Sequence, residues 1–359
     1  MARTLRLVQV LHRHGDRSPL HNVFRGGTST QFQAEDALWT TKLQEPVTTR
    51  GIYGELTTVG VAQMQARGLK LRDRYLALGW TLDDKVDIHV RSTHYVRTQR
   101  SVQALLSRFV PHVHDQLPLE ILPPSVDYIN AYNANAASIM PLKTHLVEAH
   151  AALAAREAHM APVQTELRRL LPMFASSAES FSWMKAADYF VCRQAHNIPL
   201  LPHTEELADA TTQHLAYRFH EFYTYAPILT RVSGPLVVQL VTEMQRVMPS
   251  RDVPNATDLS VERVVVYSGH DVSLLALLNA LHSSTQPTTK TVVDWPDYGA
   301  AVTIELYDEQ GNSDQWMVQV TLDGSPVAPP VDAQRFCHDL LQTVLLPNDL
   351  DENDVVVPK

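Results

Sequence analysis

The chain has 359 residues, 45% of them hydrophobic, and carries a formal net charge of -9 at pH 7. A chain of this length can bury more than one minimal core, so we expect one large domain with an insertion, or two domains. The acidic balance leaves no basic excess for a nucleic acid backbone or an anionic membrane, which argues against nucleic acid partners.

The apolar segments of the chain are short. None of them reaches the roughly 20 residues that a membrane-spanning helix needs, so we expect no stable membrane insertion. The first segment ends in a polar motif and not at a small-residue cleavage site, and we interpret it as a buried strand of a cytoplasmic protein. The sequon at Asn255 is weak evidence for secretion, and an organellar or secreted location stays open if a targeting segment has been removed.

The two cysteines, Cys192 and Cys337, lie far apart and outside any cluster with histidine. They can form at most one disulfide, and their spacing predicts no zinc site. His112 and His114 are spaced as a metal-chelating pair, but no nearby carboxylate or cysteine completes a ligand set. We therefore expect no metal and no other cofactor. The sequence gives no indication of the oligomeric state.

Strand and helix patterns alternate in the first part of the chain. The run Leu5–Leu11 predicts a buried strand, and the polar stretch from about Arg25 to Gly54 predicts a long loop. Apolar residues at the helical period then predict a helix over Val61–Leu78. A strand at Val86–Val90 and a helix over Val102–Phe109 follow.

A long helical region interrupts this alternation. Residues from about Pro123 to Ser233 show helical patterns and no convincing strand. Beyond them, strand-like runs fall at Arg263–Tyr267, Ala301–Tyr307 and Trp316–Leu322, and an apolar helix is predicted over Leu274–Leu281. The acidic run Asp349–Asp354 is interpreted as a solvated tail. The order indicates an α/β core of residues 1–122 and 234–359, with residues 123–233 inserted as a helical cap.

The strongest chemical signal follows the first predicted strand and reads His12-Arg13-His14-Gly15-Asp16-Arg17-Ser18-Pro19. Ligands of open α/β sheets bind at the carboxyl ends of strands, which is where this motif falls. It places the His14 imidazole between the guanidinium groups of Arg13 and Arg17, which attract an anion and disfavour protonation of the imidazole. Because a neutral imidazole facing a phosphate is a nucleophile, His14 is the candidate for attack on phosphorus.

Two further strand ends carry polar side chains. The second predicted strand continues into Arg91-Ser92-Thr93, and we expect Arg91 to add a third guanidinium at the same edge of the sheet. A later strand ends in Gly269-His270-Asp271 and runs directly into an apolar helix, whose N-terminal N–H groups also favour an anion.

Each of these signals taken alone is more often structural than functional, because strand-end arginines are usually solvated and an aspartate before a helix is usually an N-cap. Their occurrence together is what indicates a phosphate site. The five defined positions of the pattern R-H-G-x-R-x-P match by chance with a probability on the order of 10⁻⁴ in a chain of this length.

With these motifs the sequence resembles the histidine acid phosphatase family, branch 2 of the histidine phosphatase superfamily. Leu56-Thr57-Thr58-Val59-Gly60 followed by Gln63 is similar to a helix start of that family. Two segments look most like the lysophosphatidic acid phosphatase subgroup, namely Gln194-Ala195-His196-Asn197 and the stretch from Trp295-Pro296 to Glu305-Leu306-Tyr307.

The resemblance implies a phosphoglycerate-mutase-like mixed sheet with helices on both faces, plus an inserted helical cap. It implies that His14 becomes phosphohistidine and that Asp271 protonates the leaving oxygen and then activates water. The phosphate oxygens would be held by Arg13, Arg17, Arg91 and His270.

We therefore expect a metal-independent acid phosphatase for a small phosphomonoester, with lysophosphatidic acid as a candidate substrate. Aspartic acid, with an ordinary pKa of about 4, holds its proton only at low pH, which predicts an acidic optimum. A phytase is the nearest alternative, but it must bind a highly charged inositol polyphosphate, and the expected loop offers only Arg25, Lys42 and Arg50. An inactive phosphate-binding protein of the same fold is the other alternative, and the complete catalytic set argues against it.

Overall fold

The computed structural model describes residues 3–44, 51–82, 86–175, 180–248, 263–285, 294–309 and 312–345. The sequon at Asn255, Arg50 and the acidic run Asp349–Asp354 lie outside these described residues. Within the described ranges, no helix is both long and apolar enough to cross a membrane. Cys192 and Cys337 are buried and both are free thiols, so they form no disulfide with each other.

The described part of the chain contains one mixed sheet of eight strands, in the order β3-β2-β4-β1-β5-β6-β7, with β8 paired to β6. Strands β3, β2, β4 and β1 are parallel, and β5 and β6 run antiparallel to their neighbours. The strands are β1 (Arg3–Arg13), β2 (Asp87–Ser92), β3 (Leu119–Ile121), β4 (Arg263–Gly269), β5 (Ala301–Glu309), β6 (Asn312–Leu322), β7 (Ser325–Pro326) and β8 (Val331–Asp332). All five predicted strands are confirmed.

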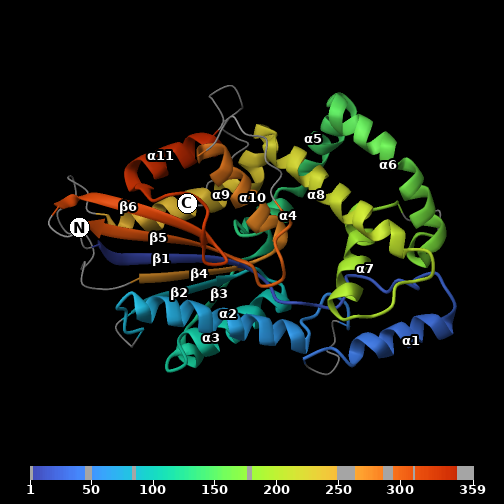
Figure 1. Cartoon of the computed structure of the whole chain (residues 1–359), viewed down its shortest axis with the longest axis horizontal. Helices are drawn as coiled ribbons and strands as arrows, with labels where there is room; N and C mark the ends of the chain where they lie inside the picture. The colour runs from blue at the N-terminus through green and yellow to red at the C-terminus, as the bar shows by residue number, and fades with distance from the viewer. Residues whose placement is uncertain are drawn as a thin grey trace.

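Helices cover both faces of the sheet (Figure 1). Helices α2 (Thr58–Ala77) and α3 (Val96–Phe109) lie on one face, and α9 (Ala226–Val247), α10 (Asp271–Thr285) and α11 (Ala333–Val344) lie on the other. Strand β1 is apolar along its length because both of its faces are buried. Val8 and Val10 join the core under α2 and α3, whereas Leu7 and Leu11 join the larger core under α9 and α10.

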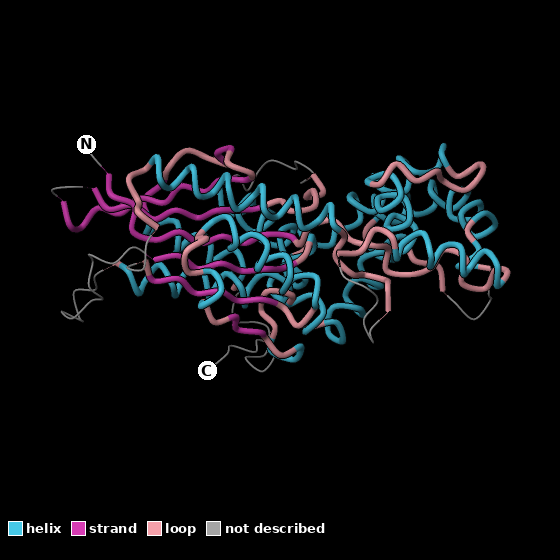
Figure 2. The backbone as a smooth tube through the Cα atoms, turned by 90° about the horizontal axis from the view of Figure 1, so that it is seen from below, coloured by secondary structure: helices cyan, strands magenta, loops and turns pink. Residues whose placement is uncertain are grey.

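A second group of helices extends beyond the end of the sheet at which β1 finishes, and Figure 2 shows this group as a separate lobe. It contains α1 (Ser29–Thr40), α5 (Ala136–Ala149), α6 (Ala151–Leu170), α7 (Trp183–Ala195) and α8 (Ala208–Thr224), and the short α4 (Ala131–Ala134) leads into it. The described residues between 123 and 233 are helical and contain no strand, as the sequence predicts.

Two boundaries differ from the expectation. The predicted loop from Arg25 to Gly54 is wrong over Ser29–Thr40, which forms α1 and begins with a capping box between Thr28 and Gln31. Helix α9 continues through residue 233, where the cap was expected to end, and Gln9 of β1 donates a hydrogen bond of 2.9 Å to the Leu240 carbonyl of α9. The division into core and cap therefore stays a proposal.

Candidate active site

The register of the parallel strands brings the two ends of the chain together. Arg13 at the end of β1 lies opposite Gly269 at the end of β4, and the His14 N–H donates a hydrogen bond of 3.0 Å to the Gly269 carbonyl. His270 follows directly, so the His14 and His270 rings lie with their centroids 5.4 Å apart. Two motifs separated by more than 250 residues thus form one site because their strands are neighbours.

The start of α2 fixes the loop that carries His14. The Gln63 side chain accepts a hydrogen bond of 2.8 Å from the Asp16 N–H, and the Thr57 hydroxyl donates one of 2.5 Å to the Asp16 carboxylate. A Cβ atom on Gly15 would overlap the backbone of Gly60, so this close approach requires glycine. The segment 56–63 at the start of α2 therefore positions the loop that carries His14.

A contact from the helical lobe reaches the same loop. His196, which follows α7, lies with its Nε2 atom 2.5 Å from an Asp16 carboxylate oxygen, and both side chains are buried. Trp39 of α1 packs edge-on against the His196 ring, with the two ring centroids 5.4 Å apart. Asp16 therefore joins the sheet, α2 and the helical lobe at a single carboxylate.

A cavity of about 330 Å³ opens at this end of the sheet. Its polar lining residues are Arg13, His14, Arg17, Arg97, His270, Asp271, Asp188, Asn130 and Asn133. Its apolar and aromatic lining residues include Leu20, Tyr95, Tyr132, Met184, Leu215, Val272, Trp295 and Tyr298. Among the described residues, no group of three or more His, Cys, Asp or Glu side chains is placed to hold a metal ion.

A backbone contact orients the His14 ring. Its Nδ1 atom lies 2.8 Å from the Gly15 carbonyl oxygen, which can only accept, so Nδ1 carries the proton and Nε2 carries the lone pair. Burial lowers the pKa of His14 well below its ordinary value, and the positive charges of Arg97 and Arg17 lower it further. Burial and these charges therefore favour the neutral form of His14.

Two arginines of the motif are oriented by carboxylates. Arg13 pairs with Asp271 at 3.0 Å and stacks over the Tyr298 ring at 4.0 Å, and Arg17 pairs with Asp188 at 2.7 Å. Asp271 also accepts a hydrogen bond of 3.3 Å from the Trp295 indole. These pairs fix the guanidinium groups before an anion arrives, which lowers the cost of ordering them.

Arg97 is the site residue that sequence reasoning missed. It lies in the first turn of α3, lines the cavity and donates to the Gly54 carbonyl at 3.5 Å, and its guanidinium lies 4.3 Å from the Tyr95 ring centroid. No carboxylate lies within ion-pair distance of it among the described residues. Burial and the charge of Arg17 lower the pKa of Arg97 to about 10. Such a desolvated, unmatched cation favours a bound anion.

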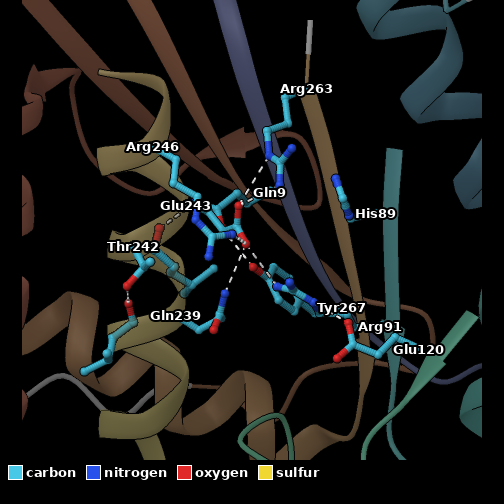
Figure 3. A network of polar contacts seen from close by, with 12 residues as sticks. Gln9, His89, Arg91, Glu120, Gln239, Thr242, Glu243, Arg246, Arg263 and Tyr267 are labelled. Carbon is cyan, nitrogen blue, oxygen red and sulfur yellow. Dashed lines mark hydrogen bonds and ion pairs between the residues drawn. The ribbon is translucent and has the colours of Figure 1, made fainter. Parts of the chain in front are cut away.

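The expectation for Arg91 is wrong: it does not line the cavity. Arg91 lies opposite Tyr267 in the β2–β4 register, two residues before the edge at Gly269, and its side chain points toward α9. There it pairs with Glu243 at 3.2 Å and with Glu120 at 3.0 Å (Figure 3). Arg263 and Arg246 complete the shell around the fully buried Glu243 carboxylate.

The contrast between these two arginines gives a direct test. We expect Arg97→Met to lower kcat/KM for phosphomonoester hydrolysis, the activity expected from the sequence, by about 10² to 10³-fold, as for loss of one preorganised charge at the reacting group. Arg91→Met should leave kcat/KM nearly unchanged but destabilise the fold by about 1–3 kcal/mol, because buried Glu243 loses a partner. Steady-state kinetics and urea unfolding of both variants check this. Equal kinetic losses in the two variants would contradict the placement.

We expect the buried His12 to make the free energy of unfolding depend on pH. Burial lowers its pKa from 6.5 to about 4. Between about pH 6.5 and pH 4 the unfolded chain therefore binds a proton at His12, whereas the folded chain does not. The free energy of unfolding should fall by on the order of 3 kcal/mol as the pH falls through this range.

The variant His12→Asn keeps an N–H donor for the Arg13 carbonyl but cannot be protonated in this range. Its urea-unfolding free energy should fall less steeply with acidification than that of the unmodified protein. Parallel curves for the two proteins would show that His12 does not carry this effect.

The fold and the site together define an α/β protein in which a buried histidine and three arginines line one cavity at the carboxyl end of the sheet. The sequence profile described as "Histidine phosphatase superfamily (branch 2)" matches residues 4–323, and the chain belongs to this family. The resemblance seen in the sequence motifs is confirmed.

Curated relatives are similar to the chain over most of its length. Lysophosphatidic acid phosphatase type 6 of Bos taurus is 23% identical over 384 residues, covering 93% of this chain and 80% of the relative. Lysosomal acid phosphatase of Bos taurus is 27% identical over 311 residues, covering 78% of this chain and 63% of the relative.

Solved structures share the fold. The phytase of Klebsiella sp ASR1 superposes with a TM-score of 0.62 at 16% identity, covering 100% of both chains. A multiple inositol polyphosphate phosphatase of Bifidobacterium longum superposes with a TM-score of 0.60 at 11% identity, covering 90% of this chain and 87% of that chain. At these identities the likeness shows the fold alone, and it confirms the expected mixed α/β architecture.

Proposed function

We propose that this protein is an acid phosphatase that hydrolyses phosphomonoesters through a phosphohistidine at His14. The observation that carries the proposal is the His14 ring itself, whose unprotonated Nε2 results from the Nδ1–Gly15 contact and whose pKa is lowered by burial beside Arg97 and Arg17. A phosphomonoester carries close to two negative charges at neutral pH, and the arginines supply charge and orientation for its transfer.

The reaction proceeds in two displacements at phosphorus. In the first, the His14 Nε2 lone pair forms a P–N bond while the P–O bond to the alcohol breaks, and Asp271 gives its proton to the departing oxygen. In the second, water attacks phosphorus, the P–N bond breaks and Asp271 takes the proton from the water. Two inversions leave the configuration at phosphorus retained.

Asp271 suits the role of proton donor because of its partner. Its carboxylate is paired with Arg13 at 3.0 Å. A bound dianion competes for that guanidinium, and a carboxyl close to a dianion favours its protonated form. Substrate binding would thus help Asp271 to hold the proton that it donates to the leaving oxygen.

The surroundings of the cavity favour a small monoester over an inositol polyphosphate. The cavity contains three arginines, two of which are already paired with Asp188 and Asp271, and neither Arg25 nor Lys42 of the expected loop lines it. Its apolar and aromatic lining residues would suit a substrate such as lysophosphatidic acid, which several relatives carry in their names. A phytase-type activity and an inactive phosphate-binding protein stay the alternatives. A cytoplasmic location likewise stays a prediction, and three relatives are named lysosomal acid phosphatase.

Hydrolysis of a generic aryl phosphate across about pH 4 to 8, with and without EDTA, tests the proposal. We expect turnover that survives chelation and is highest in acid. Binding of inorganic phosphate without any turnover of aryl phosphate, alkyl phosphate or phytate would favour the inactive protein, and turnover of phytate alone would favour the phytase.

A further inference from the structure

A second cavity of about 400 Å³ adjoins the first on the side of the helical lobe. The two cavities share Tyr132, Met184 and Leu215 as lining residues, so they lie next to each other at these side chains. Their walls are also in contact, because Trp295 of the first packs edge-on against Phe219 of the second at 5.3 Å. The second cavity lies between α5, α7 and α8 and is lined by aromatic rings, among them Phe181, Trp183, Phe219 and Phe222.

Lys143 of α5 brings a positive charge into this aromatic cavity. Its ammonium lies 4.6 Å from the Phe222 ring centroid, 5.1 Å from that of Tyr132 and 5.4 Å from that of Phe219. It donates one hydrogen bond, of 2.8 Å, to the Tyr132 hydroxyl. No carboxylate lies within ion-pair distance of it in the described part of the chain. Two of its three N–H donors are therefore left for a ligand.

The other charged groups of this cavity do not neutralise Lys143. Arg218 also lines the cavity but is paired with Glu157 at 2.7 Å, and Glu148 at the rim is exposed. Burial, together with the charge of Arg218, lowers the pKa of Lys143 to about 8, so the ammonium is still protonated in acid. The cavity thus combines apolar walls with one unmatched cation.

We propose that the second cavity binds the far end of the leaving alcohol, and that this end carries a carboxylate that pairs with Lys143. The favoured substrate is then a phosphomonoester whose leaving group is an apolar chain or ring system ending in a carboxylate. A single ammonium among aromatic rings matches a singly charged carboxylate better than a dianionic phosphate, which needs several donors and more hydration. This inference rests on the proposed phosphatase activity.

The test uses pairs of substrates that differ only at the far end. One is a homologous series of straight-chain ω-phosphonooxy carboxylic acids, and the other is the series of alkyl phosphates of equal lengths, all below their micelle concentrations. An aryl phosphate too short to leave the first cavity reports the chemistry alone. The proteins compared are the unmodified protein, Lys143→Met, and Lys70→Met as a control for an exposed lysine outside both cavities.

For the unmodified protein, we expect kcat/KM to rise above a certain chain length for the carboxylates, and to exceed that of the matched alkyl phosphates. Lys143→Met should lower kcat/KM for the long carboxylates by about tenfold, as for loss of one partly desolvated ion pair. It should leave the aryl phosphate unchanged and should not impair the alkyl phosphates. Lys70→Met should behave as the unmodified protein.

Three results would overturn the inference. Equal losses on carboxylates and alkyl phosphates would assign Lys143 to packing alone. No preference for the carboxylate in the unmodified protein, with no effect of Lys143→Met, would show that the second cavity does not take this group. Absence of aryl phosphate hydrolysis in the unmodified protein would overturn the proposed activity itself, which the other two results leave intact.

Discussion

Replacing His14 by alanine is expected to lower kcat by about 10⁴ to 10⁶-fold, the range seen when a covalent nucleophile is removed from a hydrolase. The reason is that no other described side chain of the cavity can replace it: His270, the nearest imidazole, lies beside Thr93 with its Nε2 atom 3.2 Å from the hydroxyl. Phosphate binding should survive in the variant, because all three arginines remain. Steady-state kinetics with an aryl phosphate, together with phosphate binding by calorimetry, measure both quantities.

The matched control for this variant is His89→Ala. His89 lies on β2, pairs with Asp87 at 3.0 Å and is absent from the cavity lining, so its loss should leave kcat unchanged. Thermal unfolding of both variants separates a chemical effect from a folding defect. Residual turnover of more than about one hundredth in a folded His14→Ala would argue that the nucleophile is another group.

Replacing Asp271 by asparagine should produce a loss that depends on the leaving group. An alkoxide needs a proton as it departs, whereas a nitrophenolate is stable enough to leave without one. We therefore expect kcat/KM to fall by about 10² to 10⁴-fold for an alkyl phosphate and by much less for a nitrophenyl phosphate. The decay of the phosphoenzyme should also slow, since water loses its base, and a burst should appear with the good leaving group.

Asp188→Asn is the appropriate comparison, because Asp188 is the other carboxylate of the cavity and pairs with Arg17 instead of Arg13. Loss of the Asp188 charge should weaken binding of the phosphate group by a similar factor for the alkyl phosphate and the nitrophenyl phosphate. A plot of kcat/KM against the pKa of the leaving alcohol should steepen only in Asp271→Asn. Equal slopes in both variants would remove Asp271 from the role of general acid.

The central part of the site was predictable from the sequence because it depends on strand ends. A continuous apolar run indicates a buried parallel strand, and the residues that follow this strand lie at the carboxyl edge of the sheet. This reasoning placed His14, His270 and Asp271 correctly in one cavity. It also yielded the five main strands and the helices on both faces.

The same reasoning predicted Arg91 for the site in place of Arg97, because a sequence pattern cannot determine the register between neighbouring strands. Both arginines follow the apolar run of β2, and only the pairing of Arg91 with Tyr267 shows that Arg91 stops two residues short of the edge. Arg97 reaches the cavity from the first turn of α3, on the far side of the strand–helix connection. The lone signal available was its position early in a helix that begins at the correct edge.

Helix α1 escaped prediction for a different reason. Its apolar residues do not follow the helical period, and its inner face is held by a buried ion pair between Glu35 and Arg193 of α7 together with the Trp39–Glu35 hydrogen bond of 2.8 Å. Such polar anchoring leaves no helical period in hydrophobicity. The capping box at Thr28 and Gln31 was a usable start signal. Strands β3, β7 and β8 are two or three residues long, too short for any pattern.

The most direct test of the account is to trap the covalent intermediate. Asp271→Asn mixed with a radiolabelled nitrophenyl phosphate and quenched in alkali should retain label, since phosphohistidine survives base and is lost in acid. Peptide mapping should place the label on His14, with stoichiometry approaching one per active chain, and His14→Ala should take up none. Label on another residue, or turnover with inversion at phosphorus and no labelled protein, would contradict the proposed mechanism.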